Sequence, residues 1–329
     1  MAPRLLARLA CAAAPALAGC SGSQAVLASQ GPHAESTAGI AWLLFAGGTA
    51  IFAGVLAAIW LAARGPAGAR DVLAREGMVL AMGLGLPVAT LSGLLVHSLR
   101  TNAAIAPRDP PALAIEVQGE QWWWRVHYLD DQGRPVFATA NEIRIPVGRS
   151  VELLLRSGDV IHSFWVPQLA GKLDMIPGRT NRLRIQADRP GVFRGQCAEY
   201  CGGAHAMMAF HVVAEPPAEF EAWLQRQREP AAPPRDAEAA RGRDVFLANG
   251  CGLCHHVAGT GAMGRFGPDL THVGGRLHLV SGWLPNQRGS IAGWIASAQH
   301  VKPQNRMPSF TQIAGADLRA LAAWLEGLE

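Results

Sequence analysis

The strongest pattern along the chain is a pair of long apolar runs near its N-terminus, at residues 39–63 and 77–99. Each run exceeds the ~20 residues that a helix needs to cross the hydrocarbon core of a bilayer. The segment between the runs holds more basic than acidic residues: Arg64, Arg70 and Arg75 against Asp71 and Glu76. Because such loops remain in the cytoplasm, the pattern predicts a transmembrane helix hairpin, within residues 21–105, whose two ends face outward.

The middle of the chain changes to short segments in which apolar and polar residues alternate, as in residues 182–186. This period of two is typical of half-buried strands. Strands are predicted at residues 113–118, 122–128, 142–146, 151–156, 182–186 and 208–213. We expect an all-β Greek-key domain of the cupredoxin type over residues 106–227, with ligand-bearing loops held by the rigid sheets beneath them.

The last third of the chain has helical periodicity. A Pro-rich stretch at residues 228–236 predicts a stiff linker. Residues 237–248 and 317–328 repeat apolar positions at a spacing of three and four, which indicates two amphipathic helices. We expect a small all-α domain over residues 237–329, in which these terminal helices cross.

The composition of 329 residues, half of them hydrophobic, fits a membrane unit followed by two small domains. The net charge of +4 is too mild to indicate a nucleic-acid partner. Arg4 and Arg8 precede an apolar run that ends in Leu17-Ala-Gly-Cys20. This predicts a lipoprotein-type signal over residues 1–20, with lipid on Cys20, and a place in a bacterial inner membrane. The alternative is an uncleaved leader with an ordinary cysteine.

The segment from Cys197 to Met208 concentrates two thiols, an imidazole and a thioether. Soft sulfur ligands at this density favour copper. Gly202 and Gly203 disfavour a regular helix here, so a looped ligand segment is predicted. His162, on a β-prone run, could supply a second imidazole. A disulfide, or a zinc site that includes His205, is the alternative.

These residues resemble the CuA domain of cytochrome c oxidase subunit II. That family has a His-Ser-hydrophobic-hydrophobic-x-Pro run, followed by Cys-x-Glu-x-Cys-x3-His-x2-Met, and this sequence carries every element. The resemblance implies a dinuclear copper centre with the following ligands: Cys197 and Cys201 as bridges, His162 and His205 as caps, and Met208 and the Glu199 carbonyl as weak axial ligands. Met207 is then expected to be a core residue.

Two further family features are implied by the resemblance. Trp122, in the run Gln121-Trp-Trp-Trp124, matches the tryptophan through which electrons reach CuA. The alternative is a packing role, because aromatic triplets in strands usually belong to the core. The alternation of side chains along a strand turns at least one of the three tryptophans inward. The carboxylate of Glu199 would help to bind Mg²⁺ at the contact with subunit I, or is an ordinary hydrogen-bonded group.

A second redox motif, Cys251-Gly-Leu-Cys254-His255, is the attachment signature of c-type haem. Its cysteines form thioethers to the porphyrin and its histidine ligates iron. Met307, which precedes Pro308, resembles the sixth iron ligand of class I cytochromes c. Met263 is the alternative sixth ligand, because the chain between it and His255 is long enough to reach the iron. Pro268 resembles the family's proline, whose carbonyl accepts a hydrogen bond from the histidine that ligates the iron, here His255.

Taken together, the chain resembles subunit II of a caa3-type haem-copper cytochrome c oxidase with a fused cytochrome c domain. The resemblance implies that a soluble cytochrome c or another periplasmic donor reduces the haem, that CuA takes the electron, and that subunit I, accompanied by subunit III, reduces oxygen. The alternatives are the CuA subunit of a nitric oxide reductase and a free-standing membrane electron-transfer lipoprotein. A quinol oxidase subunit would lack the copper ligands.

Overall fold

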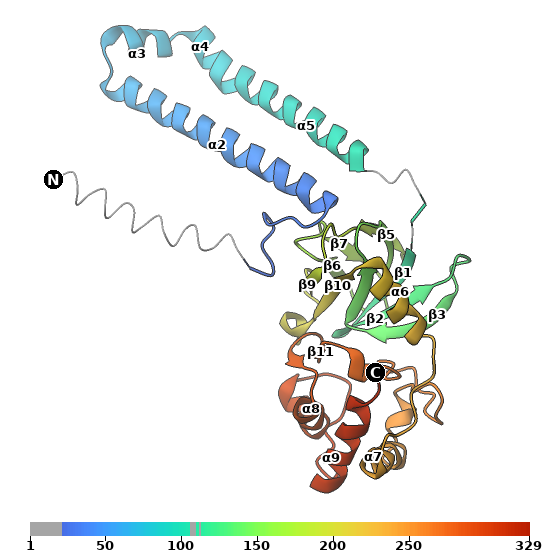
Figure 1. The fold of residues 1–329 in the computed structure, drawn as a ribbon. Helices are drawn as coiled ribbons and strands as arrows, with labels where there is room; N and C mark the ends of the chain where they lie inside the picture. The colour runs from blue at the N-terminus through green and yellow to red at the C-terminus, as the bar shows by residue number, and fades with distance from the viewer. Residues whose placement is uncertain (1–21, 106–109, 112) are drawn as a thin grey trace, which may run out of the picture. The chain divides into compact units, whose positions relative to one another are not determined.

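The computed structural model describes residues 22–105, 110–111 and 113–329 (Figure 1). Cys20 and the expected signal lie outside the described residues. The described chain divides into a helical unit, residues 33–109, and a second unit that holds the residues before His33 together with those from Pro110 to the C-terminus.

The first unit is a pair of long apolar helices. One is α2 (Pro32–Arg64). The other is built from α4 (Glu76–Leu80), a π-helical turn (Ala81–Gly85) and α5 (Leu86–Ile105), after the short α3 (Ala67–Leu73), and its candidate membrane span is Glu76–Ala103. Both have a mean hydropathy of 2.0 over their most apolar windows, with none of those residues buried. By length and composition, each can cross a membrane.

The β-domain consists of two five-stranded sheets, ordered β3-β2-β1-β5-β8 and β4-β10-β9-β6-β7 (Figure 1). Their strands are β1 (Leu113–Glu120), β2 (Trp123–Leu129), β3 (Pro135–Ala140), β4 (Glu142–Pro146), β5 (Val151–Ser157), β6 (His162–Trp165), β7 (Leu173–Met175), β8 (Asn181–Ile185), β9 (Gly191–Cys197) and β10 (Ala209–Glu215). The pairs β1–β5 and β4–β10 are parallel, and the others are antiparallel. All six predicted strands are present, within two residues at each end.

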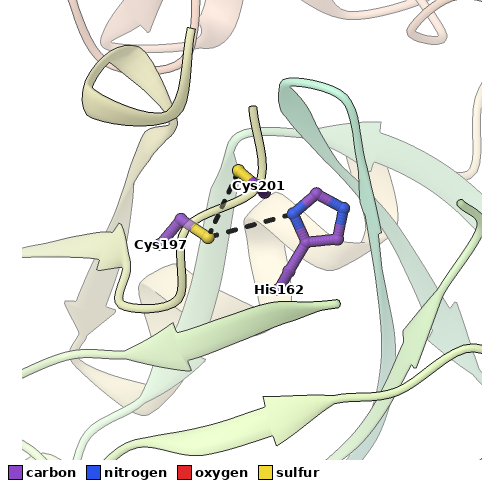
Figure 2. Close-up of side chains that lie close together, drawn as sticks. All are labelled: His162, Cys197 and Cys201. Carbon is purple, nitrogen blue, oxygen red and sulfur yellow. Dashed lines mark hydrogen bonds between the residues drawn. The ribbon is translucent and has the colours of Figure 1, made fainter. Parts of the chain in front are cut away.

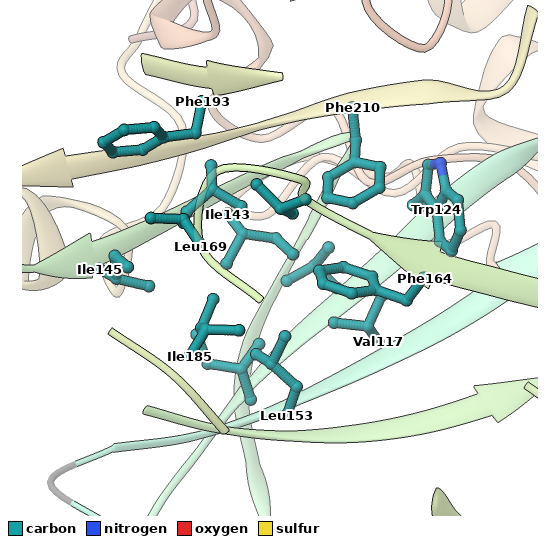
Figure 3. Close-up of a cluster of buried hydrophobic side chains, with 14 of the residues drawn as sticks. Val117, Trp124, Ile143, Ile145, Leu153, Phe164, Leu169, Ile185, Phe193 and Phe210 are labelled. Atoms are coloured by element: carbon teal, nitrogen blue, oxygen red, sulfur yellow. The ribbon is translucent and has the colours of Figure 1, made fainter. Parts of the chain in front are cut away.

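The core lies between the two sheets, where the inward residues of each strand are buried (Figure 3). Trp124 packs edge-on against Phe210, with ring centroids 4.8 Å apart, and against Phe164 at 5.9 Å. Gly195 has no room for a side chain because a Cβ there would overlap the Phe210 ring. This aromatic cluster fixes β6, β9 and β10, the strands that border the predicted copper ligands.

The helical domain follows α6 (Pro217–Arg226) and contains α7 (Ala237–Ala248), α8 (Arg288–Val301) and α9 (Gly315–Glu326), with a short ladder between β11 (His278–Leu279) and β12 (Leu284–Pro285). Asp236 caps α7 by accepting a hydrogen bond from the Ala239 N–H. Helices α7 and α9 cross closely, and Phe246 packs against Trp324 with ring centroids 5.1 Å apart.

Gly242, on α7, makes this crossing possible, because a Cβ there would overlap the backbone carbonyl of Ala320. We expect Gly242→Ala to destabilise the helical domain by about 1–3 kcal/mol through overpacking. Gly293→Ala is the matched control on α8, where a Cβ meets nothing within 4 Å; it should be neutral or stabilising. Thermal unfolding of the two variants measures both effects, and equal midpoints would contradict the assigned crossing.

Candidate metal and haem sites

Three buried donor side chains meet where β6 begins and β9 ends (Figure 2). Cys197 is the last residue of β9, Cys201 lies in the loop beyond it, and His162 opens β6. The Sγ atoms of the two cysteines are 3.8 Å apart, and Cys197 Sγ is 3.8 Å from His162 Nδ1. A disulfide needs sulfurs about 2.05 Å apart, so both thiols are free and remain available to a metal.

The remaining predicted copper donors surround the same pair. His205 Nδ1 lies 3.4 Å from Cys201 Sγ, and Met208 Sδ lies 3.8 Å from it. The Glu199 carbonyl oxygen is 3.2 Å from Cys197 Sγ. Each sulfur therefore has its own imidazole and its own weak donor. This set of thiols, imidazoles and a thioether fits copper chemically.

The two thiols have opposite pKa shifts because each lies beside the other. The hydrogen bond between Cys197 and Cys201 lowers the pKa of Cys197 to about 4, although burial opposes the shift. The same pairing, together with burial, raises the pKa of Cys201. Cys197 is therefore the thiol that ionises more readily, and metal binding favours the deprotonated form of both.

Asp159 orients His162 and was not singled out by the sequence. Its Oδ1 lies 2.8 Å from His162 Nε2, and its Oδ2 accepts a hydrogen bond from the Gln121 N–H at 2.7 Å. Burial lowers the pKa of His162, but the bonds to Asp159 and Cys197 outweigh it and raise that pKa. With Nε2 held by the carboxylate, Nδ1 faces the sulfurs. The only sequence signal was an acid three residues before the histidine.

The tryptophan run supports the cysteine loop. Trp122 Nε1 donates to the Cys201 carbonyl at 2.9 Å, and Gln121 Nε2 donates to the same oxygen at 2.8 Å. Trp124 is core, and the Trp122 residue is only 7% exposed. The role of Trp122 in receiving electrons stays a prediction, but its indole touches the copper-ligand loop.

The carboxylate of Glu199 is half-exposed and lies 3.8 Å from Lys172 Nζ. This contact fits the reading of an ordinary paired carboxylate, and the Mg²⁺ ligand role stays a prediction. Met207 packs against the core of the β-domain, as expected from its place beside Met208.

The haem motif lines a cavity of about 330 Å³ that the helical domain forms together with residues of the β-domain. Cys251, Cys254, His255 and Met307 all face this cavity. His255 Nδ1 donates to the Pro268 carbonyl at 2.7 Å, which leaves Nε2 as the nitrogen for iron. Gly267 has no room for a side chain, because a Cβ would lie 2.6 Å from His255 Cε1. The mainly apolar lining and these four donors fit a c-type haem.

The positions of Met307 and Met263 decide between them as candidates for the sixth haem ligand. Met307 lines the cavity, and its loop is fixed by hydrogen bonds from its N–H to Asn305 Oδ1 and from Gln299 Nε2 to its carbonyl, both at 2.7 Å. Met263 is 65% exposed and is not among the lining residues. The geometry therefore favours Met307 as the sixth ligand.

The β-domain and the helical domain meet at a pair of stacked imidazoles. His211, on β10, stacks on His278, on β11, with ring centroids 4.3 Å apart. Burial, together with the charges of His278 and Arg194, lowers the pKa of His211 to about 4. His211 lies within the strand predicted at residues 208–213, but its partner in the helical domain was not predicted.

Comparison with known families matches residues 131–215 to the periplasmic domain of cytochrome c oxidase subunit II and residues 239–329 to cytochrome c. A cytochrome c oxidase subunit 2 from Alkalihalophilus pseudofirmus is 37% identical over 250 residues, covering 74% of this chain and 71% of the relative. One from Bacillus sp. (strain PS3) is 28% identical, covering 74% and 72%. The solved periplasmic domain of subunit II of cytochrome oxidase from Bradyrhizobium japonicum is 31% identical, covering 36% and 96%, with a TM-score of 0.34.

Removal of the Asp159 carboxylate should weaken the metal site without changing its ligands. We expect Asp159→Ala to lower copper affinity by about 10–100-fold, because His162 loses the acceptor that orients it. Asp131→Ala, an exposed acid in the β2–β3 turn, is the control. Competition titration with a copper chelator measures both, and equal affinities would refute the orienting role.

Acid should weaken the folded protein through His211. The unfolded histidine has a pKa of about 6.5, whereas that of the folded one is about 4. The unfolded state therefore binds more protons between these values, and stability falls as pH drops from about 6.5 to 4. Denaturant unfolding at several pH values should show a shallower loss in His211→Phe than in the wild type or in the exposed control His300→Phe. Parallel curves for all three would contradict this assignment.

Proposed function

Because the chain belongs to the cytochrome c oxidase subunit II family, we propose that it carries electrons from a covalently bound haem c to a dinuclear copper centre and on to the catalytic subunit of the oxidase. The fused cytochrome c domain makes the haem part of the same polypeptide. The observation that supports this proposal best is the pair of free thiols 3.8 Å apart, each with an imidazole beside it.

The residues of the copper site have separable tasks. Cys197 and Cys201 would bridge the two ions, and His162 and His205 would each cap one. Met208 and the Glu199 carbonyl would complete the set as weak donors. When bound, such a centre supplies a one-electron carrier whose charge is shared by two metals. Burial of both cysteines and His162 excludes water from the donors, and the β-sandwich holds them in place.

The haem site is supplied by the helical domain. Cys251 and Cys254 would form the thioether bonds, while His255 and Met307 would ligate iron. The Pro268 carbonyl fixes the tautomer of His255, so that Nε2 is presented to the metal. When bound, this haem supplies the first electron acceptor of the chain. Its donor would be a soluble cytochrome c or another periplasmic protein.

The membrane arrangement follows from the same proposal. The two apolar helices, Pro32–Arg64 and Glu76–Ala103, would anchor the subunit in the bacterial inner membrane beside subunit I, with subunit III as a further partner. The Arg-containing loop between them would face the cytoplasm, and both termini and the redox domains the periplasm. We propose residues 1–20 as the signal, Cys20 as its lipidated residue, and residues 228–236 as the linker between the two redox domains.

The relatives are oxidase subunits, which favours an oxidase over a nitric oxide reductase.

Two cysteine substitutions test the copper centre and the haem centre separately. The purified holoprotein should hold two copper ions per chain, with a mixed-valence paramagnetic signal spread over both nuclei, and one low-spin His–Met haem. Cys201→Ser should abolish the copper signal and leave the haem spectrum unchanged. Cys254→Ser should disturb the haem attachment and leave the copper signal intact. Zinc in the thiol site, or a single copper ion, would contradict the proposal.

A further inference from the structure

Lys302 is the most unusual charged residue at the contact between the two redox domains. It directly follows α8 of the helical domain, yet it is only 3% exposed. Its ammonium donates three hydrogen bonds, to the backbone carbonyls of Trp122 and Met207 in the β-domain and to Ser281 Oγ. An ammonium has three protons, so each finds an acceptor.

The burial of Lys302 depends on specific contacts of its ammonium. Lysine is almost never fully buried unless its charge is compensated, because removing an ammonium from water is unfavourable. Burial lowers the pKa of Lys302 to about 7, with the nearby Cys201 opposing the shift. Ser281 strengthens the contact, since its hydroxyl also donates to the Trp122 carbonyl at 3.0 Å.

Further contacts join the loop of Met307 to the copper site. Arg306, directly before Met307, lies 3.8 Å from the Asp159 carboxylate that orients His162. Gln304 occupies the space beside Gly203 in the copper-ligand loop, where a Cβ would overlap its side chain. The loop that offers the haem ligand thus packs against the loop that offers the copper ligands.

The haem cavity itself is shared between the domains. Gln121, Trp122 and Trp123 of the β-domain line it together with His255 and Met307. Trp122 also donates to the carbonyl of Cys201. One indole therefore borders the haem cavity and contacts a bridging copper ligand.

We propose that Lys302 is a positioning residue that locks the haem domain onto the copper domain, so that electrons cross between the two centres within a docked unit, by way of Trp122. In this step the reduced haem loses one electron and the oxidised copper pair gains it, while no bond forms or breaks. The inference rests on the proposed function, because it needs both centres. It also means that a soluble donor delivers its electron to the haem and not to the covered Trp122.

The chain provides its own probe of docking, because Lys172 and Lys302 are its only lysines. Lys172 is half-exposed. In the holoprotein, a pulse of acetic anhydride read by mass spectrometry should modify Lys302 at least about tenfold more slowly than Lys172, since Lys302 reacts only on local opening. Equal rates would overturn the lock. This experiment is independent of electron flow, so its failure is distinct from failure of the proposed function.

The role in electron transfer is tested in the oxidase with Lys302→Met. Flash photoreduction of the haem should show transfer to copper slowed by about tenfold or more, because charge-assisted hydrogen bonds that hold the domains are lost. The optical and paramagnetic spectra of both centres should stay unchanged. Arg319→Met, an exposed cation on α9, is the control and should transfer at the wild-type rate. A wild-type rate in Lys302→Met would overturn the proposal.

A milder variant covers the case in which Lys302→Met does not fold. Ser281→Ala removes one acceptor of the ammonium and one donor to Trp122. It should speed the acetylation of Lys302 relative to Lys172 and slow haem-to-copper transfer in the same preparation. Faster labelling with unchanged transfer would overturn the positioning role, and unchanged labelling would overturn the lock.

Discussion

The structure depends on one constraint, which is that two buried thiol sulfurs stay side by side without bonding to each other. The end of β9 holds Cys197, and the adjoining loop brings Cys201 back to within 3.8 Å. The aromatic packing of Trp124, Phe164 and Phe210 makes the supporting strands rigid. Because protein interiors are close-packed, such a frame keeps donor atoms in place whether or not a metal is present. A preformed site of this kind suits an electron carrier, since little has to move when charge arrives.

The second centre is built on a different principle. The proposed haem ligands come from loops between helices, and they line one mainly apolar cavity. Hydrogen bonds then select among the possible donors: the Pro268 carbonyl fixes the proximal histidine, and Asn305 fixes the loop of Met307. The two candidate sites meet at Trp122, so the rigid sandwich forms a wall of the cavity as well as the frame of the thiol site.

Much of this was predictable from sequence because the chemistry is local. The segment Cys197–Met208 and the motif Cys251–His255 carry their ligands at fixed short spacing, and alternation gave six of the ten strands of the β-domain. Other features depend on segments distant in sequence. Asp159 and Lys302 belong to neither ligand motif, and only the fold shows that Asp159 orients His162 and that Lys302 reaches from one domain to the other. Strand β9 was missed because Gly191 and Gly195 interrupt its pattern, and Gly195 is there to admit the Phe210 ring.

The central claim is that sulfurs 197 and 201 together bridge two metal ions. Diffraction from crystals of the full, copper-loaded chain, recorded on both sides of the copper absorption edge, tests it most directly. The account predicts two resolved copper peaks, both within bonding distance of both sulfurs, with one imidazole on each. A single copper peak, or a covalent bond between the two sulfurs, would contradict it.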